Sequence, residues 1–146
     1  MALVLAFDSG PLGQLAHPDN TRYPDLLRWL AEHRIAGTRF VFPEIADFEV
    51  RRNLILERRR RSLRRLNDVL SLGHYLPITT SAMRLAAVLW AHQRRAGRSV
   101  GDPKELNADV IVAAQSLQAQ AVLITDNPRH FPPRLATAHW SAIKMP

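Results

Sequence analysis

The chain alternates short apolar runs with longer segments in which apolar residues recur at helical spacing. Residues 2–7 are continuously apolar, as in a strand buried on both faces of a sheet. Residues 23–35 instead repeat apolar side chains every three or four positions. By these criteria, strands are predicted at residues 2–7, 38–42, 75–78, 121–125 and 136–140, the last at an edge. Helices are predicted at residues 23–35, 58–72, 81–96 and 108–118, with another opened by Pro43.

Local signals refine several of these boundaries. Gly37 is expected to end the first helix, and Asn107 is expected to cap the start of the last one. The helix at residues 81–96 is apolar nearly all round until Arg94 and Arg95, which predicts packing on more than one side. The segment 97–103 is the candidate for a mobile loop.

Strands that alternate with helices define the fold class. They imply parallel strands joined by right-handed crossovers, with helices on both faces of the sheet. A length of 146 residues is enough to bury a core, and neither an internal repeat nor a domain boundary is visible. We therefore expect one α/β domain over residues 1–146, a Rossmann-like three-layer α/β/α sandwich around a mainly parallel sheet.

Acidic residues stand where a sheet of this kind binds ligands, beyond the carboxyl ends of its strands. Asp8 directly follows the first predicted strand, and Asp126 directly follows the fourth. Glu49 lies about two turns into the helix after the second strand. Asp109 falls in the first turn of the predicted helix before the fourth strand, which begins on the same side of the sheet. All four carboxylates are therefore expected to face one cleft.

A group of carboxylates without cysteine or paired histidine favours a hard cation. Oxygen ligands suit Mg²⁺ or Mn²⁺, held partly through water. Such ions activate water and stabilise the charge that develops on a phosphate, and two of them sit about 3.5–4 Å apart in two-metal sites. Without a cation, the like charges would repel and raise at least one pKa. The absence of cysteine also excludes disulfides, thiolate catalysis and cysteine-bound zinc.

Each acid also has a purely structural interpretation. Asp8 could cap the turn before Leu12, and Asp109 could be a first-turn acid favoured by the helix dipole. Glu49 could pair with Arg52 or Asn53 along its own helix. Asp126 could simply initiate a turn. These interpretations are reasonable one at a time, and they are weaker when the four positions are taken together.

The helix after Pro43 carries three acids, of which one is selected for the cleft. Asp47 is expected to pair with Arg51, and Glu44 suits the positive end of the helix dipole. Glu44 and Glu49 stand about 140° apart around a helix, so both cannot point at one ion. Glu49 is the predicted ligand, with Glu44 as the alternative.

The charged residues are unbalanced in number and in kind. Twenty Lys and Arg face 13 Asp and Glu, for a net charge of +7, and only Lys104 and Lys144 are lysines. Arginine presents a planar fork that fits phosphate, so the bias favours a phosphate-bearing partner. An arginine-rich proteome would give the same composition.

Arginines are concentrated within residues 51–65, where they would form a positive flank beside the cleft. A polyanion bound there would be sensitive to salt. Single-stranded RNA is one favoured partner, an acidic partner protein is another, and a merely solvated charge run is the plain alternative. The predicted RNA-binding arginines are Arg51, Arg52, Arg58 and Arg59.

Four motifs follow one another along the chain. They are an apolar strand ending in Asp8-Ser9, PEIADFEVRR at 43–52, NADVIVAAQ at 107–115, and TDNPRHF at 125–131. In this order and spacing they resemble the PIN domain, of the kind found in VapC-type toxins of bacterial toxin–antitoxin pairs. The resemblance runs over nearly the whole chain, and the last two motifs are its most telling parts.

The resemblance implies a ribonuclease that depends on Mg²⁺ or Mn²⁺ and has an α/β/α fold. Asp8, Glu49 and Asp109 match the first three acids of the family pattern. The fourth position is contested, because the family usually has Asp or Asn two residues after the Thr. That place holds Asn127, whereas Asp126 stands one residue earlier. Either residue could complete the metal shell.

Neighbouring side chains receive secondary roles from the same resemblance. The hydroxyls of Ser9 and Thr125 would orient the carboxylates or bind phosphate of the RNA. His130 lies in the fourth motif and is expected to pack beside Phe131 rather than face the cleft.

The expected activity is hydrolysis of single-stranded RNA by the toxin of a type II toxin–antitoxin pair. The resemblance also implies a cognate antitoxin, whose tail would lie over the cleft, and a homodimer. The alternative is a PIN-like module that binds RNA or protein with little or no catalysis. A phosphotransfer or receiver-type domain is disfavoured, because neither lysine stands where such a domain needs one.

The sequence predicts a soluble cytoplasmic protein. Residues 3–7 are too short for the core of a signal peptide, and Asp8 ends them. No apolar run approaches the roughly 18 residues that span a bilayer. The lack of cysteine fits a reducing compartment.

Overall fold

Five parallel strands form the centre of the molecule. A computed structural model describes residues 2–19, 22–97 and 103–146, with side chains described from residue 107 onward in the last of these ranges. The strand order is β3-β2-β1-β4-β5, and every neighbouring pair is parallel. The strands are β1 (Val4–Phe7), β2 (Arg39–Pro43), β3 (His74–Leu76), β4 (Val122–Ile124) and β5 (Thr137–Ala138). The predicted parallel α/β fold is therefore confirmed.

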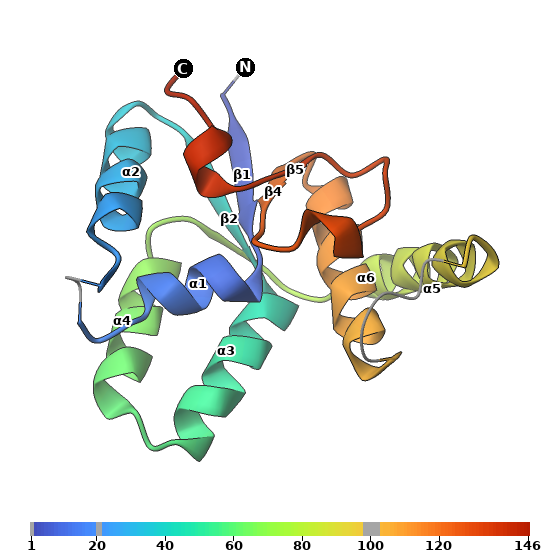
Figure 1. The fold of residues 1–146 in the computed structure, drawn as a ribbon, viewed down its shortest axis with the longest axis horizontal. Helices are drawn as coiled ribbons and strands as arrows, with labels where there is room; N and C mark the ends of the chain where they lie inside the picture. The colour runs from blue at the N-terminus through green and yellow to red at the C-terminus, as the bar shows by residue number, and fades with distance from the viewer. Residues whose placement is uncertain (1, 20–21, 98–102) are drawn as a thin grey trace.

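Helices cover both faces of this sheet, with α1, α2 and α4 on one side and α6 on the other (Figure 1). The helices are α1 (Ser9–Leu15), α2 (Pro24–Ile35), α3 (Glu44–Leu56), α4 (Arg60–Leu70), α5 (Thr80–Arg95) and α6 (Pro103–Gln118). Two short 3₁₀ turns, η2 (Pro128–His130) and η3 (Trp140–Ala142), complete the C-terminal part. The expected three-layer arrangement is thus present.

Two hydrophobic cores lie on opposite sides of the sheet because side chains of a strand alternate in direction. Leu5 and Phe7 of β1 belong to the core under α1, α2 and α4, where the Phe7 ring lies 5.6 Å from that of Phe40 between centroids. Ala6 points the other way, into the core that includes Leu89 of α5 and residues of α6. The central strand is therefore buried on both faces, as its continuous apolar run predicted.

Most predicted boundaries lie within two residues of those observed, one differs by more, and one helix was missed. Helix α1 was not predicted as a helix; it begins directly after Asp8, which is its N-cap. Helix α6 begins at Pro103, so the prediction that Asn107 caps it is wrong, since proline is well suited to the first helical position. Asp109 consequently lies near the end of the second turn rather than in the first. The predicted loop at 97–103 falls mostly outside the described residues.

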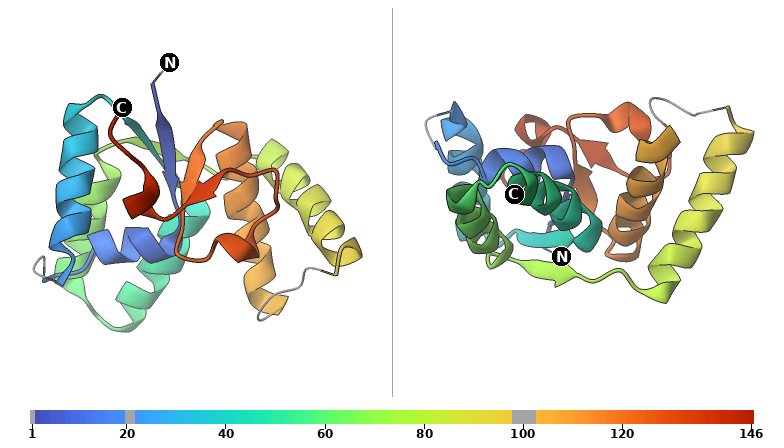
Figure 2. Two further views of the ribbon diagram at one scale, coloured as in Figure 1. Left: turned by 45° about the horizontal axis from the view of Figure 1, so that its top comes forward. Right: turned by 90° about the horizontal axis from the view of Figure 1, so that it is seen from below.

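Helix α5 contradicts the expectation that it packs on more than one side. It lies beyond α6, away from the sheet, and packs mainly against α6 (Figures 1 and 2). Met83, Val88 and Trp90 are consequently 47%, 49% and 37% exposed. The apolar pattern correctly indicated a helix with two apolar sides, but other parts of this chain pack against only one of them.

None of the helices described in the structure is both long and apolar enough to cross a membrane.

The close approach between the start of β3 and β2 depends on a glycine. A Cβ at Gly73 would lie 2.3 Å from the backbone oxygen of Phe40, closer than any real contact. We expect Gly73→Ala to destabilise the fold by ~1–3 kcal/mol, the usual cost of overpacking. Urea unfolding measures this. In the control Gly13→Ala, the added Cβ meets Val50 at an ordinary 3.8 Å, so unchanged or raised stability is expected there. Equal behaviour of the two variants would contradict the prediction.

Candidate metal centre

The four predicted acids meet in one hollow at the carboxyl edge of the sheet. The hollow has a volume of about 180 Å³. Its lining comes from the ends of β1 and β4, from the first turn of α1, and from α3, α6 and η2. The residues are Asp8, Ser9, Gly10, Glu49, Asp109, Asp126, Asn127 and His130. Residues separated by more than one hundred positions are therefore brought together as the sheet rule predicted.

Asp8 joins the central strand to the first helix. Its backbone N–H donates to Ile124 O at 3.0 Å, which ties the end of β1 to β4. Its side-chain Oδ1 accepts from the N–H of Ser9 at 2.8 Å and so caps α1. Its Oδ2 accepts from the Thr125 hydroxyl at 2.7 Å. Both carboxylate oxygens are thus already oriented by donors.

Burial raises the pKa of Asp8 above its ordinary value of 3.8. Asp8 is only 8% exposed, and removal from water disfavours the charged carboxylate. The bonds from Thr125 and Ser9 act in the opposite direction, because they stabilise the charge. The nearby Asp126 carboxylate raises the pKa further, and His130 lowers it. The repulsion among acids that the sequence led us to expect therefore contributes to the raised pKa of Asp8, but less than burial does.

Thr125 organises the end of β4. It is fully buried, and its hydroxyl donates to Asp8 while accepting the backbone N–H of Asn127 at 3.0 Å. One hydroxyl therefore fixes the Asp8 side chain and the turn that carries the contested fourth position. The predicted orienting role of Thr125 fits this geometry. Contacts of Ser9 or Thr125 with phosphate stay a prediction.

The three acids of α3 have different surroundings. Glu44 accepts the backbone N–H of Ile78 at 2.9 Å through Oε1, and it therefore supports the segment after β3. Asp47 is buried and bonded to Arg51 and Tyr75, which confirms the predicted pair with Arg51. Glu49 lines the hollow. The choice of Glu49 over Glu44 thus has a structural basis.

The Asp47 cluster also affects Tyr75. Its hydroxyl donates to Asp47 Oδ2 at 2.6 Å. Desolvation first, and then this bond to Asp47, raise the pKa of Tyr75 above its ordinary value. Tyr75 therefore stays a hydrogen-bond donor to a carboxylate that is structural.

His130 faces the hollow, so the expectation that it packs beside Phe131 instead is wrong. Its Nδ1 lies 3.5 Å from Asp109 Oδ2. The 3₁₀ turn that follows Asn127 folds the chain back and aims the imidazole at α6, whereas Phe131 enters the core on that side of the sheet. The proline in TDNPRHF is the sequence signal for this reversal.

The contested fourth corner contains both candidates. Asp126 and Asn127 each line the hollow. The Asp126 carboxylate accepts from Gln14 Nε2 at 3.1 Å and lies 3.6 Å from His139 Nε2. Asn127 is anchored through its backbone N–H to Thr125.

The donor set suits a hard divalent cation, because it consists of carboxylate oxygens with one amide. Asp8, Glu49 and Asp109 would supply the oxygens, with Asp126 or Asn127. Among the described residues, no three Asp, Glu or His side chains stand in an arrangement that would hold an ion as it is. The metal site stays a prediction, and it requires the carboxylates to converge.

The four predicted RNA-binding arginines are in different environments. Arg51 is occupied by Asp47 and by Asn67, whose Oδ1 accepts at 2.9 Å. Arg52 is exposed, with its guanidinium 5.3 Å from the centre of the Phe48 ring. Arg58 and Arg59 lie in the exposed α3–α4 turn, where Arg59 pairs with Glu57 at 2.5 Å. Contacts with RNA stay a prediction for all four.

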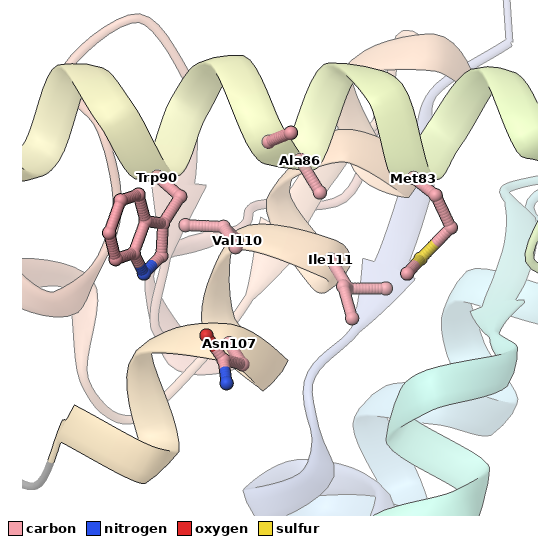
Figure 3. Close-up of a pocket in the computed structure, with 7 residues that line it drawn as sticks. Met83, Ala86, Trp90, Asn107, Val110 and Ile111 are labelled. Carbon is pink, nitrogen blue, oxygen red and sulfur yellow. The ribbon is translucent and has the colours of Figure 1, made fainter.

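A larger hollow lies elsewhere, between α5 and α6, with a volume of about 500 Å³ (Figure 3). Its lining is Met83, Ala86, Ala87, Trp90, Asn107, Val110 and Ile111. Asn107 is the amide among them, and none of the described residues that line this hollow is an acid or a base. The carboxylate hollow, where four acids meet, is therefore the candidate reaction site.

Comparisons with known proteins support the fold. No family model and no curated protein matches the sequence. A chain of VapBC2 from Rickettsia felis, solved with a promoter DNA fragment, aligns with a TM-score of 0.77 at 13% identity, over 94% of this chain and 99% of that one. A chain of FitAcB from Neisseria gonorrhoeae aligns with a TM-score of 0.72 at 18% identity, over 95% of this chain and 99% of that one. A chain of VapBC-1 from nontypeable Haemophilus influenzae aligns with a TM-score of 0.66 at 20% identity, over 95% of this chain and 99% of that one.

These matches extend over nearly the full length of both partners in each comparison. They confirm, at the level of the fold, the resemblance to PIN domains of VapC-type toxins that the four motifs indicated. At such low identities they show the shared fold alone.

The raised pKa of Asp8 has a consequence for stability. The ionised carboxylate disfavours the folded state, fully so above the folded pKa, and the penalty disappears as the pH falls below the unfolded value of 3.8. We expect Asp8→Asn, measured in EDTA at pH 7, to raise the Tm, because the amide carries no charge to bury. The gain should shrink toward pH 4. Asp68→Asn, at an exposed acid of α4, is the control. A lower Tm for Asp8→Asn throughout would contradict the prediction.

Proposed function

We propose that this protein is an endoribonuclease dependent on Mg²⁺ or Mn²⁺ that hydrolyses single-stranded RNA. The observation that supports this most directly is the meeting of Asp8, Glu49, Asp109 and Asp126 in one hollow. They come from four separate parts of the chain, and two neighbouring acids of α3, Glu44 and Asp47, are bound elsewhere. A dense group of carboxylates in a protein of net charge +7 fits a cation that in turn meets a polyanion.

In the proposed reaction, Asp8, Glu49 and Asp109 would hold the cation, with Asp126 or Asn127 completing the shell. The bound cation supplies activation of water and stabilisation of the charge on the phosphate. The chain's own residues prepare the site: Thr125 and the Ser9 N–H fix the direction of the Asp8 oxygens. The burial that raises the pKa of Asp8 is offset when a positive ion approaches.

The biological role proposed here is that of the toxin in a type II toxin–antitoxin pair. Its support is the fold shared with chains of VapBC and FitAcB complexes over at least 94% of this chain. A cognate antitoxin is therefore the proposed protein partner, and a homodimer the proposed assembly. Co-expression with the product of the neighbouring reading frame tests the pairing, since an antitoxin should co-purify and abolish RNA cleavage.

A second candidate is a PIN-like module that binds RNA or protein with little catalysis. One observation favours it: the described acids do not form a ready-made ion site. The two functions differ in RNA cleavage, because a binding module would bind RNA without cleaving it, whichever divalent metal ion is added.

The cleavage assay uses purified protein, single-stranded RNA and Mn²⁺. Asp8→Asn and Asp109→Asn are each expected to lower kcat/KM by at least ~100-fold, because each removes a carboxylate charge at the reacting centre. Asp68→Asn serves as the matched control on α4 and should cleave as the wild type does. Wild-type turnover in both hollow variants would refute the assignment, and RNA retention without cleavage by the wild type would select the binding module.

Variants of two adjacent arginines, Arg51 and Arg52, are expected to affect different properties, the first stability and the second RNA binding. Arg51→Ala leaves the buried Asp47 without its ion pair and should cost ~1–3 kcal/mol of stability in urea unfolding. Arg52→Ala removes an exposed charge, so stability should hold. Its RNA affinity should fall, with a smaller dependence on salt concentration in filter binding. An unchanged salt dependence for Arg52→Ala would exclude that residue from the RNA surface.

A further inference from the structure

The Asp126 carboxylate is held by side chains from two segments outside the four motifs. Gln14 of α1 donates its Nε2 hydrogen to Oδ2 at 3.1 Å. His139, which follows β5, places Nε2 3.6 Å from Oδ1. Each carboxylate oxygen therefore has its own partner, and the two partners come from opposite ends of the chain.

The backbone around η3 sets the direction in which His139 can donate. Its Nδ1 accepts the N–H of Ser141 at 3.2 Å, and the Ser141 hydroxyl lies 2.7 Å from the same atom. Because Nδ1 acts as an acceptor of a backbone N–H, the ring hydrogen of a neutral imidazole is on Nε2. Nε2 is the atom that faces Asp126.

Gly10 makes the room that this arrangement needs. A Cβ at that position would lie 2.9 Å from Asp126 Oδ2, closer than real contacts allow. Gly10 is within α1 and its φ does not lie in the left-handed region, so the backbone does not require glycine there. Glycine also destabilises a helix relative to alanine. The physical reason for a glycine at position 10 is therefore the space that the Asp126 carboxylate needs.

We propose that Gln14 and His139 are positioning residues that hold Asp126 at the edge of the carboxylate hollow, and that Asp126, rather than Asn127, is the fourth acid of the metal site. This rests on the proposed function. A carboxylate has about four acceptor sites. Gln14 occupies one of them, and His139 lies beside Oδ1 at 3.6 Å, beyond hydrogen-bond distance, so acceptor sites remain for a cation or its water. The side chain of Asp126 is 33% exposed, and without these partners it is free to rotate into solvent.

The test measures binding of Mn²⁺ alone to the full chain, by the loss of the free-ion electron paramagnetic resonance signal. Gln14→Ala and His139→Ala should each weaken Mn²⁺ binding by ~10-fold, the effect typical of residues that orient a ligand. His139→Gln keeps a donor near the same place and should recover most of the affinity. The Tm without metal should be the same in all of them.

Two matched controls remove the same residue types elsewhere. Gln118→Ala removes an exposed glutamine that donates to Ser81 Oγ at 2.8 Å, and His92→Ala removes an exposed histidine of α5. Both should bind Mn²⁺ as the wild type does. Gly10→Ala should weaken binding, because its methyl group displaces the Asp126 carboxylate.

A double-mutant cycle tests whether Gln14 acts through Asp126. In an Asp126→Ala background, Gln14→Ala should have no further effect on Mn²⁺ affinity. A full additional loss there, or wild-type affinity in both single variants, would overturn the positioning role and leave the proposed function standing. A stronger loss in Asn127→Ala than in Asp126→Ala would overturn the choice of the fourth acid. A wild-type protein that binds no Mn²⁺ would contradict the proposed function and this inference together.

Discussion

The buried carboxylate of Asp8 is the group on which the arrangement of the site depends. Its backbone N–H continues the pairing of β1 with β4, its Oδ1 caps α1, and its Oδ2 receives the hydroxyl of Thr125. The end of the central strand, the first helix and the turn after β4 are therefore tied to a single residue. Burying that charge disfavours folding, and two donors, the Ser9 N–H and the Thr125 hydroxyl, reduce the cost without removing it. A residue with these properties is explained better by its chemistry than by stability.

The sequence was informative wherever a single strong constraint decided the structure. The apolar run before Asp8 could only be buried on both sides, and this placed β1 at the centre of a parallel sheet. The rule for parallel sheets then brought Asp8 and Asp126 to one edge. For Glu49, physics alone was insufficient, because Glu44 and Asp47 share its helix. The sequence predicted the pair of Asp47 with Arg51, and the structure adds the bond from Tyr75 to Asp47 and the bond from the Ile78 N–H to Glu44.

The predictions that were wrong concern features decided by tertiary contacts. α1 is seven residues long and contains two glycines and a proline, so its propensity is low, and it forms because Asp8 caps it and Leu12 and Leu15 enter the core. His130 turns toward Asp109 because η2 reverses the chain, which periodicity does not report. Helix α6 begins at Pro103 and not after Asn107, although asparagine is the better capping residue. The double-sided apolar pattern of α5 is real, but its second side stays exposed in this chain.

Two acids of the hollow lie beside a different kind of base from two acids outside it. Outside the hollow, Asp47 is paired with Arg51 and Glu57 with Arg59. Asp109 and Asp126 instead lie beside imidazoles, those of His130 and His139. A guanidinium keeps its charge at every accessible pH and would compete permanently with a cation for the same oxygens, whereas an imidazole can be neutral. In a chain with 18 arginines, an imidazole beside each of these two acids is therefore compatible with a divalent cation that binds the same carboxylates.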